Sequence, residues 1–345
     1  MKPIGIYIDH LGDGNKSRAI AIARQAPNHF TLIGSGLTGK SAALSVLELP
    51  DDQPQAAQHD AANDNLASTR RRTRMISDWI EAAEPALLLV DVSLQVAALA
   101  RLTATPTAYV RLSVKRDDQP HLEAFHAAEA VLCPYHRVLE AETTPQWLRD
   151  RSHYFPGLTP DITPNRSADK RLLVVRDRQF KTLSAGQLLS LARALPDWRI
   201  DVIGGHQSEA ARAANLYFHG WIDHPAHFVA ESTIVMGTAG DGLIAAVSAA
   251  GKPFICLPQA DPFGGQFEKA TRLEALNAAT VCRRWPQNWK KTIAATLKRG
   301  EAMAALHDNA GAARAAELLL DIAYSARRPA AFWSVQGNPL RFARG

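Results

Sequence analysis

Residues 220–266 read GWIDHPAHFVAESTIVMGTAGDGLIAAVSAAGKPFICLPQADPFGGQ, and this stretch decides the fold. The apolar residues 233–236 predict a buried strand, residues 243–250 a helix, and residues 254–257 a second strand. Uninterrupted apolar strands that alternate with helices are typical of a parallel sheet covered on both faces. The stretch therefore predicts an α/β domain whose ligands bind at the carboxyl ends of the strands.

Two loops of this stretch carry candidate binding residues. Three glycines in residues 237–242 would let a phosphate approach the backbone N–H groups of the following helix, and Thr238 adds a hydroxyl donor. Asp241 is an awkward neighbour for a phosphate, and it could instead cap the helix or accept a hydrogen bond from a sugar hydroxyl. Asp261 and Gln266 follow the next strand, where they could bind sugar hydroxyls as well.

The same alternation occurs twice along the chain. In the N-terminal half, apolar strands are expected at residues 4–8, 30–33, 87–90, 107–110 and 130–132. Residues 156–169 are polar and rich in proline, which predicts a linker between two doubly wound units. We therefore expect a first domain over residues 1–160, a second over residues 170–326, and a basic tail at 327–345 that could pack back on the first domain.

Composition excludes several classes of protein. Hydrophobic residues make up 46% of the chain and charged residues 21%, which argues against disorder. The net charge of +5 fits an anionic substrate or an anionic membrane surface, and it is too small to predict nucleic-acid binding. Neither the three cysteines nor the histidines show metal-ligand spacing, so no metal site is expected.

The expected location is the cytoplasm, because the sequence shows no signal-peptide pattern and no apolar run of about 18 residues. A segment at residues 50–65 without periodicity predicts a surface loop. Behind it stand Arg70, Arg71, Arg72 and Arg74. This cluster is either a solvated helix face or a contact with anionic lipid, at the inner face of the membrane, or with a polyanionic acceptor.

A second glycine-containing loop follows the first predicted strand, at residues 9–18. Such a turn can present backbone N–H groups to an anion, and it is equally compatible with a tight strand-to-helix connection in which Asp13 or Asn15 caps the helix. Both interpretations remain open from the residues alone.

The order of these features resembles the donor-binding half of GT-B glycosyltransferases. It comprises His-Gly-Trp at residues 219–221, the glycine loop at 237–242, Ala-Ala-Gly-Lys-Pro at 249–253, and then Pro258 and Gln266. The loop at residues 12–18 is similar to the Gly-x-Gly-His-x-x-Arg pattern of the MurG-like (family 28) N-acetylglucosaminyltransferase group. The resemblance implies two Rossmann-like domains that face a cleft. It also implies metal-independent transfer, with inversion, of a sugar from a nucleotide-diphosphate sugar, most simply a UDP-sugar, to an acceptor hydroxyl.

The resemblance implies two sets of site residues and no cofactor besides the nucleotide sugar as co-substrate. The donor side comprises Arg176, Gly205, Trp221, Ile222, Thr238, Gly240, Asp241, Gly242, Asp261 and Gln266. The acceptor side comprises Gly12, Gly14, Asn15, Arg18, Arg116 and His121, and the acceptor would be a glycan or a lipid-linked molecule of the cell envelope.

Two residues depart from that family's pattern. Asn15 stands where a histidine is usual, and an amide cannot act as a general base. Ala246 stands where a glutamate usually holds the nucleotide ribose. Asp13 or His10 could supply the base instead. The alternatives are a GT-B-like binding or assembly subunit with impaired catalysis, and a nucleotide-sugar hydrolase or epimerase.

Overall fold

The structure is a computed structural model of the 345-residue chain. It describes residues 1–8, 13–37, 39, 43–51, 61–113, 116–158, 162, 170–176, 183–205, 212–222, 225–260 and 265–324, except for the side chains of residue 13 and residues 61–65.

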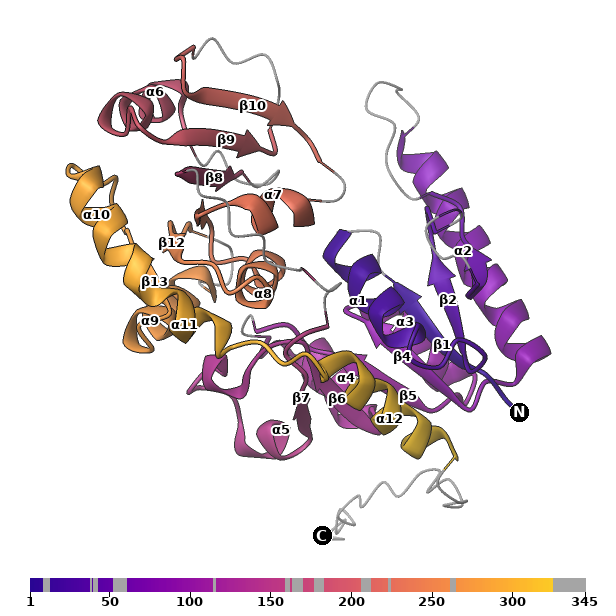
Figure 1. The fold of residues 1–345 in the computed structure, drawn as a ribbon. Helices are drawn as coiled ribbons and strands as arrows, with labels where there is room; N and C mark the ends of the chain where they lie inside the picture. The colour runs from indigo at the N-terminus through magenta and orange to yellow at the C-terminus, as the bar shows by residue number, and fades with distance from the viewer. Residues whose placement is uncertain are drawn as a thin grey trace, which may run out of the picture.

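The first sheet has seven parallel strands in the order β3-β2-β1-β4-β5-β6-β7 (Figure 1). Its central strands are short apolar runs, and Ile6 of β1 lies opposite Leu32 on one side and Leu89 on the other. These side chains are almost wholly buried, as expected for strands covered on both faces. The strands are β1 (Ile4–Ile8), β2 (Phe30–Gly34), β3 (Ser45–Glu48), β4 (Leu87–Asp91), β5 (Thr107–Val110), β6 (Ala130–Cys133) and β7 (Ser152–Tyr154).

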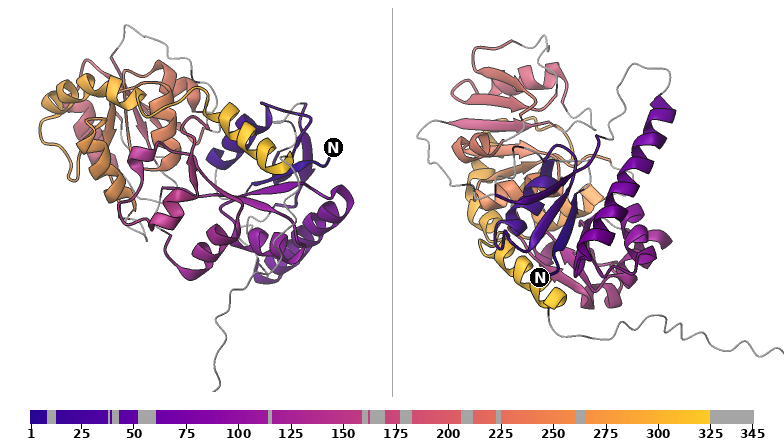
Figure 2. Two further views of the ribbon diagram at one scale, coloured as in Figure 1. Left: turned by 90° about the horizontal axis from the view of Figure 1, so that it is seen from below. Right: turned by 90° about the vertical axis from the view of Figure 1, so that its right-hand side faces the viewer.

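Helices cover both faces of this sheet. α1 (Asp13–Ala23) lies on one face, while α2 (Ala61–Ala83), α3 (Leu94–Leu102) and α4 (Gln119–Ala127) lie on the other (Figure 2). Side chains of Ser93 and Asp118 cap α3 and α4 by accepting from backbone N–H groups of the first turn. The single turn η1 (Arg137–Leu139) and the short α5 (Gln146–Asp150) lead to β7.

The second sheet has six parallel strands in the order β10-β9-β8-β11-β12-β13. The predicted fold class, two doubly wound parallel-sheet domains, is confirmed. The strands are β8 (Arg171–Val175), β9 (Arg199–Ile203), β10 (Leu216–Gly220), β11 (Ile234–Gly237), β12 (Phe254–Cys256) and β13 (Ala279–Val281). The helices are α6 (Ala185–Ala194), α7 (Ala226–Glu231), α8 (Asp241–Ala249), α9 (Gly265–Ala275), α10 (Trp289–Thr296), η2 (Leu297–Arg299), α11 (Gly300–Ala304) and α12 (Gly311–Tyr324).

Helix α12 returns to the first domain. Its apolar residues Ala312, Ala315, Ala316 and Leu319 are buried in the same core cluster as β1 and α1. At its end the Tyr324 hydroxyl donates to the backbone oxygen of Lys2 at 2.8 Å. The predicted boundary at residue 326 therefore assigns α12 to the wrong domain, because the chain crosses back at Gly311. The predicted tail at residues 327–345 lies outside the described residues.

The position of helix α2 contradicts the predicted loop at residues 50–65 and the predicted exposure of Arg72. The predicted loop extends too far, because α2 begins at Ala61. Arg72 is not part of a solvated face: it is 5% exposed and donates to the Ser35 hydroxyl and the Pro50 oxygen, both at 2.6 Å. Helical spacing places Arg72 on the side of Ile76, which faces the sheet, while the other three arginines of the cluster are exposed. Within the described part of the chain, no helix has the length and apolar character needed to cross a bilayer.

The two segments that connect the domains, one at residues 156–157 and the other at residues 308–311, pass each other with their backbones in contact. Gly157 has φ of +96°, and a Cβ there would lie 1.9 Å from the Asp308 oxygen. A Cβ on Gly311 would lie 2.0 Å from the Pro156 oxygen. Only glycine fits at either position, because the neighbouring atoms belong to the backbone and cannot turn away.

We expect the substitution Gly157→Ala to destabilise the protein. The added methyl would collide with the Asp308 oxygen and the residue would keep a strained positive φ, so the free energy of unfolding should fall by about 3 kcal/mol. Thermal and urea unfolding followed by circular dichroism would measure the change. Gly186→Ala is the matched control, since the nearest atom to its new Cβ lies 3.9 Å away. Equal midpoints for the two variants would contradict the crossing constraint.

Candidate active site

The junction between β11 and α8 is closely packed at the carboxyl edge of the second sheet. A Cβ on Gly237 would lie 2.4 Å from a methyl group of Leu243 and 3.2 Å from the Val175 oxygen. Thr238 is 4% exposed. Gly240 precedes α8 in an extended conformation and has no side chain with which to cap the helix. Among the described residues, the first-turn N–H groups of α8 and its positive dipole end are therefore open to another acceptor.

Arg176, one of the predicted donor residues, lies at the end of β8, the strand next to β11. It follows Val175 at the end of β8, and its backbone N–H donates to the Ile203 oxygen at 2.9 Å. Gly204 and Gly205 both have positive φ, and a Cβ on Gly205 would lie 2.9 Å from an Arg176 guanidinium nitrogen. The guanidinium therefore rests against Gly205, which brings together two of the predicted donor residues.

The loop after β10 adjoins these glycines. The Gly204 N–H donates to the Gly220 oxygen at 2.7 Å. Trp221 is 42% exposed, whereas Ile222 packs against the apolar core. The structure therefore places the predicted nucleotide-base residues at the same edge of the sheet as Arg176.

Asp241 is held by residues from both domains. Its carboxylate lies 3.0 Å from the Lys269 ammonium, and Lys269 is 2% exposed. The same oxygen accepts a hydrogen bond from Ser113, which follows β5 of the first sheet. The carboxylate is thus neutralised by a buried cation, and the carboxyl ends of the two sheets meet at this bond. Figure 1 shows α8 between the second sheet and the first domain.

Gln266 bonds to the chain that follows β12, the second predicted loop of the donor side. It is 6% exposed at the start of α9, and its side-chain oxygen accepts from the Gln259 N–H at 3.1 Å. Asp261 lies outside the described residues. Gly242 is exposed in the first turn of α8, and no described atom lies within 4 Å of a Cβ built there. Packing alone therefore does not require glycine at residue 242.

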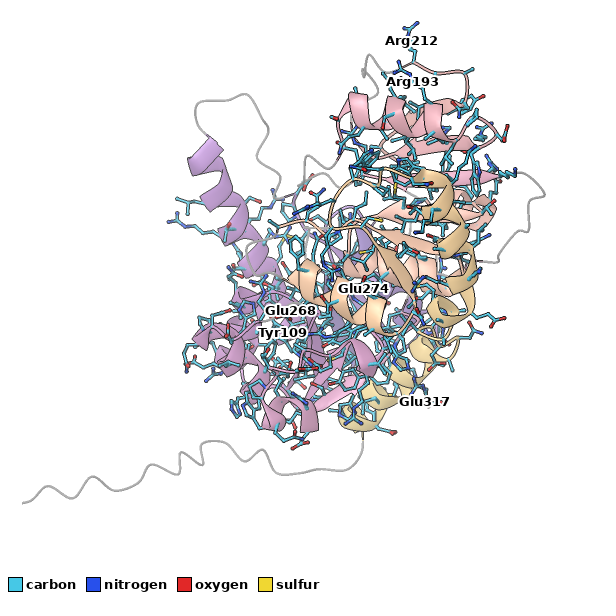
Figure 3. The ribbon with its side chains drawn as sticks, turned by 90° about the vertical axis from the view of Figure 1, so that its left-hand side faces the viewer. Tyr109, Arg193, Arg212, Glu268, Glu274 and Glu317 are labelled. Atoms are coloured by element: carbon cyan, nitrogen blue, oxygen red, sulfur yellow. The ribbon has the colours of Figure 1, made fainter. Side chains whose placement is uncertain are left out.

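A second interdomain contact lies on α9. Arg272 donates to the backbone oxygen of Leu139 at 2.7 Å and pairs with Glu268 on its own helix at 3.2 Å. Figure 3 shows Glu268 where the second domain borders the first. The domains therefore touch through α8 and α9.

On the acceptor side, Arg18 is a buried structural residue. It is 7% exposed and pairs with Asp91, at the end of β4, at 2.9 Å. It also donates to the Asn15 side-chain oxygen at 2.7 Å. Asn15 and Arg18 therefore fix α1 to the carboxyl edge of the sheet. Gly14 lies in the same helix, where no described atom lies within 4 Å of an added Cβ.

His10 and Gly12 lie outside the described residues. Asp13 is described only by its backbone, as the first residue of α1.

Arg116 and His121 lie further along the same edge. Arg116 lines a small pocket with Arg111 and Thr144. His121 is turned toward its own helix cap, because its imidazole lies 2.6 Å from the Asp118 carboxylate. That hydrogen bond lowers the pKa of Asp118. The His121 side chain therefore interacts with the N-cap residue of α4.

A buried network lies beneath this pocket, and its members Glu140, Tyr154 and Thr144 were not predicted as site residues. Arg111 is 5% exposed and bonds both oxygens of Glu140. The hydroxyls of Tyr154 and Thr144 donate to Glu140 at 2.7 Å and 2.6 Å. Burial by itself would raise the pKa of Glu140, but Arg111 and these hydroxyls lower it to about 2. A charged residue directly after an apolar strand is the only sequence signal for such a network.

Metal ligands do not gather in the described part of the chain, where no three His, Cys, Asp or Glu side chains form a cluster that could hold an ion.

Comparison with known proteins identifies the fold. No family model matches the chain, and no curated protein matches it in sequence. Among solved structures, the glycotransferase of kitacinnamycin has a TM-score of 0.69 at 15% identity, over 93% of this chain and all of its own. Spinosyn rhamnosyltransferase SpnG complexed with thymidine diphosphate has a TM-score of 0.64 at 16% identity, over 92% of this chain and all of its own.

MurG from Acinetobacter baumannii is similar as well. Its TM-score is 0.61 at 14% identity, over 92% of this chain and 99% of its own. These identities establish the fold alone. The chain has the GT-B fold of glycosyltransferases, and the predicted resemblance is confirmed at that level.

The Arg111–Glu140 pair gives a test that depends on pH. We expect Glu140→Gln to lower the free energy of unfolding by about 3 kcal/mol at pH 7, because Arg111 would lose its buried counter-ion. The folded-state pKa of Glu140, about 2, lies below its ordinary value of 4.5. The stabilisation is therefore complete above pH 4.5 and is lost as the pH falls toward 2.

Urea unfolding of both proteins between pH 7 and pH 2 would measure this change. The difference between wild type and Glu140→Gln should shrink at low pH. Glu84→Gln is the control, since Glu84 forms an exposed pair with Lys2 and should change stability little. A difference that stays constant over the whole pH range would contradict an ionised Glu140 in the fold.

Proposed function

We propose that this protein is a glycosyltransferase that moves a sugar from a nucleoside-diphosphate sugar to an acceptor hydroxyl. The observation that carries the proposal is the junction between β11 and α8, where Gly240 leaves the helix N-terminus without a side-chain cap and Asp241 contacts the first domain. The GT-B fold supports it, since the solved structures that share this fold are described as glycosyltransferases.

The donor's diphosphate binds at the N-terminus of α8. The N–H groups of the first turn and the Thr238 hydroxyl donate to its oxygens, and the Arg176 guanidinium adds positive charge. The nucleoside lies against Trp221 and Ile222, and the sugar hydroxyls reach Gln266 and the loop that contains Asp261. Backbone N–H groups and a guanidinium can stabilise the leaving diphosphate without a metal ion.

The acceptor hydroxyl binds on the first domain, near the start of α1 and Arg116. Its oxygen attacks the anomeric carbon from the side opposite the diphosphate, so the configuration inverts and the carbon–oxygen bond to the phosphate breaks. Asp13, or His10, takes the hydroxyl proton. The donor proposed first is a UDP-sugar, and the acceptor is a glycan or a lipid-linked molecule of the cell envelope. The reaction takes place in the cytoplasm, and the exposed arginines of α2 make a peripheral contact with the membrane.

A second candidate is a binding or assembly subunit without catalysis. Asn15 favours it, because its side-chain oxygen accepts from Arg18 in a structural network. Ala246 on α8, which offers no carboxylate to a ribose, favours it too. A hydrolase or an epimerase would use the same donor site, and Asp241 and Asp261 are the acidic residues it would need.

We expect calorimetric titration with UDP-, GDP- and TDP-sugars to show binding of at least one donor. Arg176→Met should weaken that binding about 10- to 100-fold, because a guanidinium–phosphate contact is lost. Arg193→Met is the matched control: Arg193 is an exposed arginine of α6, and Figure 3 shows it at the end of the second domain far from the first. Absence of binding across the panel at millimolar ligand would exclude the donor site.

Asp13→Asn separates catalysis from binding. We expect kcat for transfer to fall at least about 100-fold while donor affinity is unchanged, since the variant loses only a proton acceptor. Donor consumption and product formation would be followed by mass spectrometry. Full activity of the variant would exclude Asp13 as the base. Donor binding without turnover by the wild-type protein would favour the assembly subunit.

A further inference from the structure

A groove runs between α3 and α4 on the outer face of the first domain, away from the proposed donor site. One part, of about 330 Å³, is lined by Leu94, Ala98 and Pro120 among others. A second part, of about 630 Å³, extends to His126 and Trp147. Arg101 and Glu123 line both parts, so the two form one continuous surface. Its size is that of a site for a small organic ligand.

The far part of the groove carries a stacked aromatic pair. The rings of His126 on α4 and Trp147 on α5 lie 3.7 Å apart at an interplanar angle of 11°. Neither the imidazole nor the indole N–H makes a hydrogen bond to another described residue. A flat aromatic surface with free N–H groups suits a ligand that has both an apolar face and hydrogen-bonding edges.

The polar side chains around this pair are planar hydrogen-bonding groups. The Gln119 amide donates to one Glu123 oxygen at 2.9 Å, which holds the carboxylate in place. Arg101 is exposed, and among the described residues its guanidinium has neither a hydrogen-bond nor an ion-pair partner. An unpaired guanidinium binds a carboxylate through two parallel hydrogen bonds.

We propose that this groove binds an acidic oligosaccharide. A pyranose ring stacks its C–H face on the outer face of the exposed His126 ring, which Trp147 supports from behind. Its hydroxyls pair with Glu123 and Gln119, while a sugar carboxylate pairs with Arg101. A peptide partner is less well matched, because four of the seven residues of the larger part, Arg101, Gln119, Glu123 and His126, are polar or charged.

The groove points toward the acceptor side of the proposed active site. The inference that it belongs to the acceptor site rests on the proposed function. Leu94 and Pro120 lie in the first turns of α3 and α4, which follow the carboxyl ends of β4 and β5. The groove starts at the edge of the sheet that faces the second domain and extends about 10 Å along α4. A glycan held there would have one end near the acceptor side, so the groove is a distal subsite for a glycan acceptor.

The test uses the full chain without nucleotide, and tetragalacturonic acid as the probe. Calorimetric titration should show binding at millimolar probe or below. Arg101→Met should weaken it at least tenfold and His126→Ala several-fold, whereas Arg193→Met, which removes an exposed arginine of the other domain, should leave it unchanged. Both groove residues are exposed, so neither variant threatens folding, and circular dichroism would verify this.

Three results would overturn the inference. They are no binding of the acid, equal affinities for the Arg101→Met and Arg193→Met proteins, or equal binding of the neutral maltotetraose. Loss of self-association in Arg101→Met, seen by analytical ultracentrifugation without any saccharide binding, would assign the groove to a second copy of the chain instead. Donor titration is measured separately, so a protein that binds tetragalacturonate but no nucleotide sugar would retain the saccharide site and lose the proposed transferase function.

Discussion

The crossing of the two interdomain connections is the constraint on which the rest of the structure depends. The segment that leaves the first domain passes the segment that returns to it at Gly157 and Gly311, with no room for a side chain. Both connections are therefore fixed relative to each other at one place. The buried face of α12 then anchors the returning chain to the first core, and the carboxyl edges of the two sheets are brought together at α8 and α9.

Buried ion pairs lie at these edges, and each has the same effect on the structure. Arg18 pairs with Asp91, Arg111 with Glu140, and Lys269 with Asp241. Asp91 ends β4 and Arg111 directly follows β5, while Asp241 is the first residue of the helix that follows β11. A buried pair adds little net stability compared with apolar packing, but it is costly to break and so fixes geometry. The edges are thus rigid where a ligand would need them to be.

The sequence predicted the inner strands of both sheets, because each is a short apolar run whose burial is a local property. It missed the edge strands β3, β7, β10 and β13, which are less buried or more polar. It also predicted that the loop at Gly237 precedes a helix. It failed where the deciding partner is remote. Arg18 and Asp91 are 73 residues apart, and Ser113 and Asp241 are 128 apart. Local pattern therefore could not show that Arg18 is buried in a pair, or that Lys269 is the cation beside Asp241.

Lys269 also explains how the carboxylate of Asp241 can lie at a predicted phosphate-binding helix N-terminus. A carboxylate in the first turn of α8 would repel a phosphate, but a buried ammonium 3.0 Å away cancels most of that charge. The positive dipole end of the helix then remains at the start of α8. Asp241 also accepts from Ser113, so the same oxygen links the cation of one domain to a hydroxyl of the other. Asp241 therefore contributes both to the charge balance at the start of α8 and to the contact between the domains.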